Sequence, residues 1–184
     1  MLIDPASGLL DEAEYIPSPN QDDRPIEGQI DLLVIHNISL PPQQYGGPYI
    51  EQLFTNCLDP QAHPYFADIC HLQVSSHLLI RRDGHIVQFV PFHKRAWHAG
   101  ESCFEERVRC NDFSIGIELE GSDDEPYEDI QYQQLVAVTK CLRHDYPGIT
   151  VDHIVGHMDI APQRKTDPGP AFDWPRFRQK LASA

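Results

Sequence analysis

The amino-acid sequence predicts one layered α/β domain, and three observations lead to this prediction. Short apolar segments with the composition of β-strands are mixed with a few segments of helical periodicity. A chain of 184 residues is long enough for one domain with a full core. There is no internal repeat and no low-complexity tract. We expect a single domain over residues 1–184, in which residues 1–30 form an extended lead-in that contains Pro17, Pro19 and Pro25.

The first strands are expected from residue 31 onward. Residues 31–36 contain consecutive Leu, Val and Ile, which predicts a strand that is buried on both faces and central in a sheet. A short helix is expected at residues 49–54. Residues 77–82 and 86–90 read as two strands, and Asp83-Gly84 between them is a hairpin turn signal.

Residues 114–120 are expected to form a fourth strand, because apolar residues alternate with others along it. Ile115, Ile117 and Leu119 point to one face of this strand, and Gly116, Glu118 and Glu120 point to the other. The second face is either the solvated face of the sheet or a face that carries a functional carboxylate, since a buried carboxylate is costly unless it is paired or used.

The C-terminal third is expected to contain two helices and a strand. Residues 128–144 have apolar side chains at the spacing of one helical face. Residues 151–155 should form a strand that delivers His157 just beyond its end. Asp173 has the character of an N-cap for a last helix that contains Trp174 and Phe177.

Charge and composition exclude several function classes. The formal net charge of −14 disfavours nonspecific binding to nucleic acid or to an anionic membrane. No apolar run approaches the roughly 18 residues of a membrane span. The N-terminus lacks the features of a secretory signal peptide, and five cysteines without C-x-x-C spacing are typical of reduced thiols. We therefore expect a cytoplasmic protein, and nothing indicates an obligate protein partner.

Two distant segments contain candidate metal ligands. His36 ends the first buried strand, and His157 and Asp167 lie in the crowded segment 156–170. Two neutral imidazoles and one carboxylate form a zinc site of the open, catalytic type, in which a fourth position remains for water. The alternative is that each residue is a separate strand terminator or turn residue. Spacing alone does not choose these histidines over His77, His98, His144 or His153.

Other residues could contribute to a hydrolytic site. Glu118 is the best candidate for a general base, and Lys165 could stabilise an oxyanion, although a solvated loop lysine is the simpler interpretation. The segment Trp97-His98-Ala99-Gly100 could form the floor of a sugar or peptide cleft, or Trp97 could simply be core. The nucleophile elbow G-x-S-x-G, the phosphate-binding loop and the motif H-E-x-x-H are all missing.

Taken with their order, these segments resemble those of the zinc N-acetylmuramoyl-L-alanine amidases, which share a fold with phage-type amidase lysozymes and peptidoglycan-recognition proteins. The resemblance is greatest to the cytosolic 1,6-anhydro-N-acetylmuramoyl-L-alanine amidases of bacterial cell-wall recycling. It covers nearly the whole chain and rests on these segments: 34–42, Phe54-Thr55, 59–64, 80–84, 96–100, 109–121 and 156–170.

This resemblance implies a mixed central β-sheet flanked by helices and a role for each matching residue. His36, His157 and Asp167 match the zinc ligands, and Glu118 and Lys165 match the catalytic residues. The positions that line the muropeptide site are matched by Asn37, Trp97, His98 and Arg109. The chain departs from its relatives at Gln73, where they carry an arginine; if that arginine contacts the stem peptide, peptide affinity differs here.

The implied reaction is hydrolysis of the amide between the lactyl group of 1,6-anhydro-N-acetylmuramic acid and L-alanine in muropeptides. Zinc is the implied cofactor, Glu118 is expected to transfer the proton, and Lys165 is expected to share the oxyanion. One alternative is a noncatalytic peptidoglycan-binding module on the same fold. Another is a structural zinc site, which normally has four protein ligands.

Overall fold

The computed structural model describes residues 1–25 and 30–183, so the predicted lead-in lies partly outside the described residues, at 26–29. The described strands are β1 (Glu14–Tyr15), β2 (Gln21–Asp23), β3 (Leu32–Ile38), β4 (Leu78–Ile80), β5 (Ile86–Gln88), β6 (Lys94–Ala96), β7 (Cys103–Phe104), β8 (Arg107–Val108), β9 (Ser114–Glu120) and β10 (Ile154–Gly156). The described helices are α1 (Tyr49–Phe54), α2 (Phe66–Ile69), the 3₁₀ turn η1 (Cys110–Asp112), α3 (Asp129–Asp145), α4 (His157–Ile160) and α5 (Trp174–Ala182).

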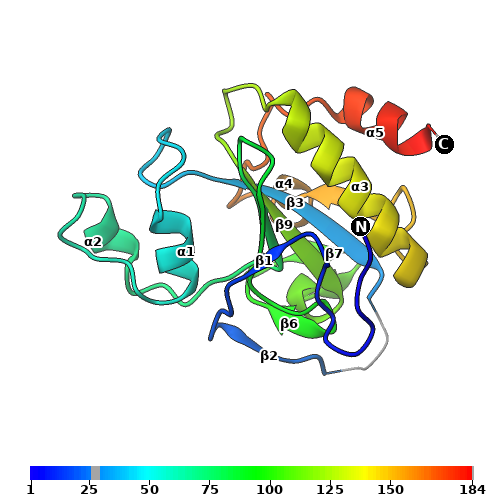
Figure 1. Ribbon diagram of the computed structural model, residues 1–184, viewed down its shortest axis with the longest axis horizontal. Coiled ribbons are helices and arrows are strands. Elements are labelled where there is room, and N and C mark those ends of the chain that lie inside the picture. Colours follow the sequence, from blue (N-terminus) through cyan, green and yellow to red (C-terminus); the bar gives the residue numbers. More distant parts are fainter. Residues whose placement is uncertain (26–29, 184) are drawn as a thin grey trace.

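A mixed six-stranded sheet forms the centre of the molecule (Figure 1). Its strand order is β1-β5-β4-β9-β3-β10, and the neighbours from β4 to β10 are all parallel. Only β5 runs antiparallel to its neighbour β4, across the predicted turn at Asp83-Gly84. The predicted α/β class, with a mixed sheet flanked by helices, is therefore confirmed.

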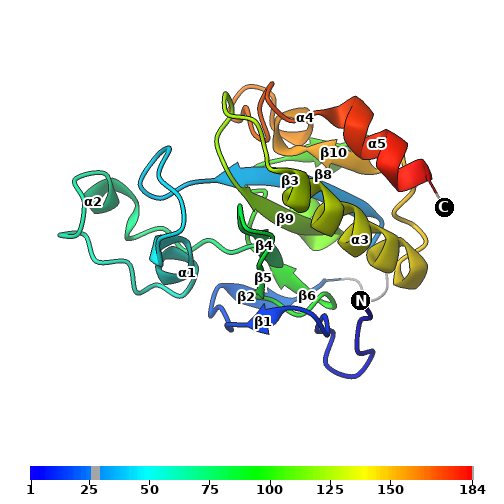
Figure 2. The ribbon, with the colours of Figure 1, turned by 45° about the horizontal axis from the view of Figure 1, so that its top comes forward.

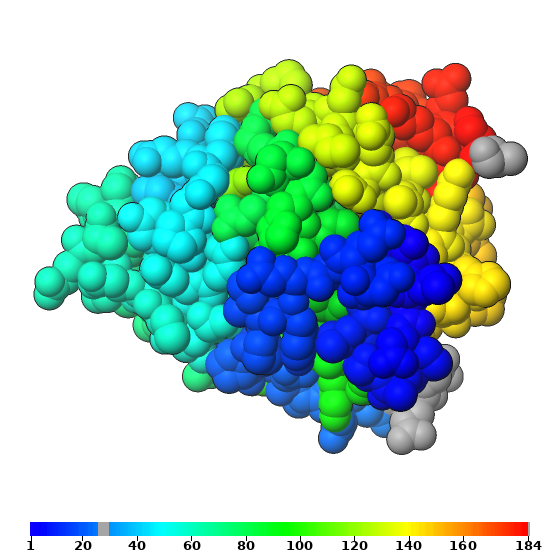
Figure 3. Space-filling model, viewed as in Figure 1, coloured from blue at the N-terminus to red at the C-terminus, as the bar shows by residue number. Residues whose placement is uncertain are grey.

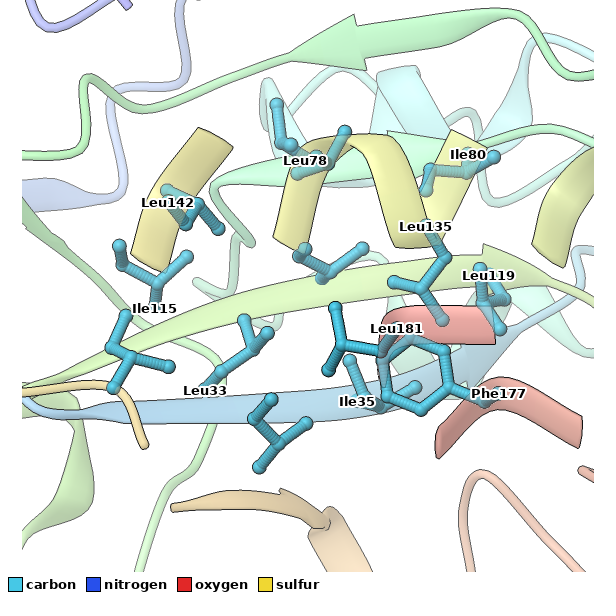
Figure 4. Packing of buried hydrophobic residues seen from close by; sticks show 14 of the residues in the cluster. Leu33, Ile35, Leu78, Ile80, Ile115, Leu119, Leu135, Leu142, Phe177 and Leu181 are labelled. Atoms are coloured by element: carbon cyan, nitrogen blue, oxygen red, sulfur yellow. The ribbon is translucent and has the colours of Figure 1, made fainter. Parts of the chain in front are cut away.

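Helices α3 and α5 cover one face of this sheet, as Figure 2 shows. The core on this face consists of Leu33 and Ile35 from β3, the three apolar residues of β9, and side chains from both helices (Figure 4). Asp173 begins α5 as predicted, because its Oδ1 atom accepts a hydrogen bond from the backbone N–H of Arg176 at 2.9 Å. The period of two along each strand sends the intervening residues to the opposite face.

That opposite face carries the polar residues of the two central strands. Val34 and His36 of β3 point there, as do Gly116, Glu118 and Glu120 of β9, and the pairing register sets His36 directly beside Glu118. All seven residues of β9 are buried. The solvated-face alternative for Glu118 is therefore wrong, because segments outside the sheet cover this side of β9 as well.

Two elements differ from expectation in the C-terminal third. The strand predicted at residues 151–155 is displaced, since β10 spans only Ile154–Gly156. Residues 150–153 instead form a turn, in which the N–H of His153 donates to the carbonyl of Thr150, and Val151 is exposed. His157 opens the short helix α4, which the sequence pattern did not indicate because it is only one turn long.

The N-terminal segment packs against the rest of the molecule, and in Figure 3 its blue atoms lie against green and yellow parts of the chain. β1 pairs in parallel with β5, β2 pairs with β6, and Leu10 is buried in the main core. The prediction of a single domain over the full chain stays a prediction. In the part of the chain that the structure describes, no helix has the length and apolar character needed to cross a membrane.

Glu120 connects the sheet to the loop that follows β3. It is almost fully buried and accepts hydrogen bonds from the backbone N–H groups of Gly46 (2.6 Å) and Arg82 (3.1 Å), while Arg81 pairs with it at 3.4 Å. We expect Glu120→Ala to lower the free energy of unfolding by about 3 kcal/mol, because these donors lose a buried acceptor.

Urea denaturation would measure this effect. The control is Asp23→Ala, which removes an exposed partner of Lys94 and should change the free energy of unfolding by less than about 1 kcal/mol. Equal effects of the two substitutions would show that Glu120 does not hold the loop.

Candidate metal centre

Two neighbouring strands and one loop bring His36, His157 and Asp167 together. β10 pairs with β3 so that Gly156 lies opposite Ile35, and His157 therefore follows directly beside His36. The Nδ1 atoms of the two histidines lie 3.0 Å apart, and each is 3.0 Å from Oδ2 of Asp167. Among the described residues, these three form the one group of histidine, cysteine or carboxylate side chains with metal-binding geometry.

The chemistry of these three atoms fits a bound cation. Nε2 of His157 lies 3.1 Å from the carbonyl oxygen of Ala99, which can only accept, so Nε2 carries the proton and Nδ1 presents a lone pair. A carboxylate oxygen and an imidazole lone pair repel each other at 3.0 Å unless a cation lies between them. Ligand atoms bonded to one zinc ion at about 2.0–2.2 Å have separations of similar size.

Burial sets the protonation states that a metal requires. It lowers the pKa of His36 to about 4, so the imidazole is neutral at pH 7. Burial alone would raise the pKa of Asp167, but the close contacts of its carboxylate with the imidazoles of His157 and His36 outweigh burial, and the net pKa is lowered. A neutral imidazole at His36 and an ionised carboxylate at Asp167 are the forms in which these side chains bind divalent metals.

Tight packing fixes the loop that carries Asp167. The backbone N–H of Met158 donates to the carbonyl of Asp167 at 2.9 Å, and the Tyr127 hydroxyl donates to that of Pro168 at 2.8 Å. Gly169 has φ +79°, and a Cβ atom there would lie 2.2 Å from Cα of Asp123. A glycine is therefore required two residues after the carboxylate ligand.

A pocket of about 330 Å³ opens over the three ligands. Its polar lining includes Asn37, His98, Glu118 and Lys165 in addition to the ligands. Its lining also includes these apolar and aromatic residues: Ile38, Leu40, Pro42, Leu53, Tyr65, Ile69 and Leu72. The metal-binding group thus lies in a cleft of mixed lining that could hold an amphipathic substrate.

Glu118 lies in this cleft as a buried carboxylate, only 9% exposed. Its Oε2 atom has no hydrogen-bond partner among the described groups, which is unusual for a buried polar atom and is typical of a group that acts on a ligand. Burial raises the pKa of Glu118 well above its ordinary value, the charge of Asp167 adds to this, and Lys165 opposes it. A raised pKa makes the carboxylate a stronger base.

Lys165 and Asn37 are further polar lining residues that the sequence predicted for the site. Lys165 is half-buried and lines the same cleft as Glu118. The Asn37 side chain donates to Oδ1 of Asp123 at 2.8 Å, which fixes its orientation at the rim. Asp123 is not among the residues that the sequence predicted for the site. Its contact with Asn37 shows that it belongs to the surroundings of the cleft.

The structure does not bring every predicted residue into this cleft. Trp97 lies outside its lining and donates through Nε1 to Asp22 of β2 at 3.2 Å. Arg109 lines a separate groove of about 530 Å³, together with Arg164, and pairs with Asp112. The substrate-binding roles of Trp97 and Arg109 therefore stay predictions. Gln73 is exposed and also lies outside the lining.

Comparisons with known proteins show which family the sequence resembles. The family model described as N-acetylmuramoyl-L-alanine amidase matches residues 26–170. The chain is 63% identical, over 97% of its length and 95% of the relative's, to the 1,6-anhydro-N-acetylmuramyl-L-alanine amidase AmpD of Salmonella typhimurium (strain SL1344).

Two solved structures give a similar result. A crystal structure of a selenomethionine derivative of AmpD has 61% identity and a TM-score of 0.95, with 98% of this chain and 99% of that chain covered. The amidase AmiD of E. coli has been solved in complex with the substrate anhydro-N-acetylmuramic acid-L-Ala-D-γ-Glu-L-Lys. It shares 33% identity with a TM-score of 0.62, over 89% of this chain and 62% of that one.

Proposed function

The chain belongs to the N-acetylmuramoyl-L-alanine amidase family, and from this premise we propose that it is a zinc-dependent enzyme of peptidoglycan recycling. Its proposed reaction is hydrolysis of the amide that joins the lactyl group of 1,6-anhydro-N-acetylmuramic acid to L-alanine in muropeptides. One observation carries this proposal: three converging side-chain atoms, 3.0 Å apart, lie in one cleft with Oε2 of Glu118, which has no hydrogen-bond partner among the described groups.

The relatives support the choice of substrate. AmpD takes its full name from the 1,6-anhydro sugar, and AmiD was solved with an anhydro-muramyl peptide. The cleft is lined by both polar and apolar side chains, which suits a sugar ring that has lost two hydroxyl groups to an internal anhydro bridge. We propose a cytoplasmic location as well, which the free thiols of the five cysteines support.

The proposed mechanism uses the side chains around the ligand group. His36, His157 and Asp167 would hold zinc, which when bound supplies a Lewis acid that acidifies water and polarises the scissile carbonyl. Glu118 accepts a proton from the attacking water at its carboxylate and then donates that proton to the nitrogen of the leaving L-alanine. Lys165 donates a hydrogen bond to the oxyanion that develops on the carbonyl oxygen.

Lys165→Ala tests the last of these roles. We expect the substitution to lower kcat by about 10²–10³-fold, because one donor to the oxyanion is lost, while KM changes little. Steady-state kinetics on an anhydro-muropeptide would measure both constants. An unchanged kcat with a raised KM would mean that Lys165 only binds the ground-state substrate.

The reaction itself is tested by mass spectrometry of the products from a 1,6-anhydro-muropeptide. We expect the free stem peptide and 1,6-anhydro-N-acetylmuramic acid, each with the mass required by the addition of one water across the lactyl amide. Cleavage within the peptide would contradict the proposed bond. Tight binding of the muropeptide without cleavage, together with a zinc content near zero, would instead indicate a binding module.

A further inference from the structure

Both histidine ligands direct their second ring nitrogen toward one short segment, Trp97–Gly100. Nε2 of His36 lies 2.9 Å from Nδ1 of His98, and the two rings meet edge to face with centroids 5.0 Å apart. Nε2 of His157 lies 3.1 Å from the carbonyl oxygen of Ala99. This segment therefore borders the proposed metal site from behind the ligands.

His98 is itself held in place from several directions. Its Nε2 atom lies 3.1 Å from Oγ of Ser114, a fully buried residue at the start of β9. Its ring lies against Gly116, where a Cβ atom would be 2.5 Å from Cγ of His98. The backbone N–H groups of His98 and Ala99 both donate to Oδ1 of Asn111, at 3.1 and 2.8 Å.

These contacts occupy both ring nitrogens of His98. One nitrogen faces His36 and the other faces Ser114, so the imidazole has no remaining hydrogen-bonding group for a substrate. Although His98 contributes to the lining of the cleft, its polar atoms interact within the protein. The family resemblance implied that His98 lines the substrate site. A hydrogen bond from its imidazole to the substrate is not available, because both ring nitrogens already have partners in the protein.

The hydrogen bonds that connect His36, His98 and Ser114 can run in either of two directions. In the first, Nε2–H of His36 donates to Nδ1 of His98, and Nε2–H of His98 donates to Ser114, so Nδ1 of His36 presents a lone pair to a metal. In the second, the Ser114 hydroxyl donates to His98 and His98 donates to His36. Nδ1 of His36 then carries a proton and cannot act as a ligand.

We propose that His98 is a positioning residue, which holds His36 in the orientation and tautomer that bind the metal, with Ser114 as its outer anchor. This inference rests on the proposed metal function. Partners of this kind raise the basicity of a ligating histidine and prevent its ring from turning. His157 receives the equivalent support from the carbonyl of Ala99, which lies on the same segment.

Metal affinity is the direct test. Each variant would be freed of metal and titrated with zinc against a chromophoric chelator, which requires no turnover. We expect His98→Ala to weaken zinc binding by about 10- to 100-fold. His98→Asn, whose side-chain oxygen can accept from His36 near the position of Nδ1, should fall between His98→Ala and the wild type. The matched control is Asn37→Ala, in the same cleft but bonded to Asp123, which should keep wild-type zinc affinity.

Two further variants separate positioning from general damage. Ser114→Ala should weaken zinc binding less than His98→Ala does, and the double substitution should be no weaker than His98→Ala alone, because Ser114 acts through His98. Gly116→Ala keeps the imidazole but displaces it, and should also weaken zinc binding. Circular dichroism of each metal-free variant shows whether it is folded. If His98→Ala or Gly116→Ala does not fold, the milder variants His98→Asn and Ser114→Ala are compared with the wild type instead.

The proposal would be overturned if folded His98→Ala bound zinc as the wild type does and showed only a raised KM, which is the result for a substrate contact. Nitrogen-15 NMR of the zinc-loaded wild type adds a second criterion, since Nδ1 of His98 must be unprotonated and Nε2 of His98 protonated; the opposite tautomer of His98 would overturn the proposal. A failure of the proposed function can be distinguished from a failure of the His98 proposal. In that case the wild-type protein itself would bind no zinc or would leave the muropeptide intact.

Discussion

Glu118→Ala is expected to lower kcat by about 10²–10⁴-fold, the usual contribution of a general base and acid. The carboxylate is buried, its Oε2 atom has no partner among the described groups, and its raised pKa strengthens it as a base. Because Glu118 is not one of the three converging ligands, the variant should bind zinc with the affinity of the wild type. Turnover of an anhydro-muropeptide and zinc content would be measured on the same preparation.

A remote glutamate provides the control for this substitution. Glu14 lies exposed on β1, where it contacts His85, and Glu14→Ala should turn over at the wild-type rate. Glu118→Gln should resemble Glu118→Ala in kcat, because an amide fills the space but cannot accept the proton. Wild-type turnover in either Glu118 variant would exclude the proposed role of Glu118.

Removal of the metal is expected to lower the rate of hydrolysis at least as much as Glu118→Ala does. Zinc contributes several kcal/mol of transition-state stabilisation to hydrolysis, so a chelated enzyme should lose more than about 10³-fold in rate. Added zinc should restore the activity of the wild type but not that of Asp167→Ala, which lacks the single anionic ligand. Activity that persists after the metal has been removed completely, as verified by elemental analysis, would exclude the metal mechanism.

Metal removal should also change stability, independently of activity. Without a cation, two imidazole nitrogens and a carboxylate oxygen face one another at 3.0 Å, and a ligand that binds only the folded state stabilises that state. We therefore expect the melting temperature to fall on chelation and to recover with zinc. In Asp167→Ala, the chelator should leave the melting temperature almost unchanged.

Much of the fold could be predicted where a local pattern is strong. The apolar run at 31–36, the turn signal Asp83-Gly84 and the helical face of residues 128–144 each produced the expected element. The short helix expected at 49–54 is also present, as α1. Other short elements were missed or displaced, among them α4 and the strand predicted at 151–155. A short element without a strong local signal contains too few repeats of a period to be recognised, and its position depends on contacts with other elements.

The candidate site divides in the same way. Residue chemistry alone identified His36, His157 and Asp167 as metal-ligand types and Glu118 as a candidate base, but it could not decide between a solvated and a buried face for Glu118. The pairing of β9 with β3 decided this, because it places Glu118 beside His36 under a covered face. Only the folded chain shows that the hydrogen-bonding atoms of His98 contact His36 and Ser114.

The sequence by itself determined the class of the fold, most of its longer elements and the kinds of side chain available for chemistry, because these depend on composition and on periods of two or 3.6 residues. The tertiary structure decided which of ten histidines converge. His36 and Asp167 are separated by 131 positions in the chain, yet their side-chain atoms lie 3.0 Å apart. The parallel pairing of β3 with β10 brings His157 beside His36, and the backbone hydrogen bond from Met158 to Asp167 holds the loop of Asp167 next to them. No local pattern in the sequence encodes these contacts.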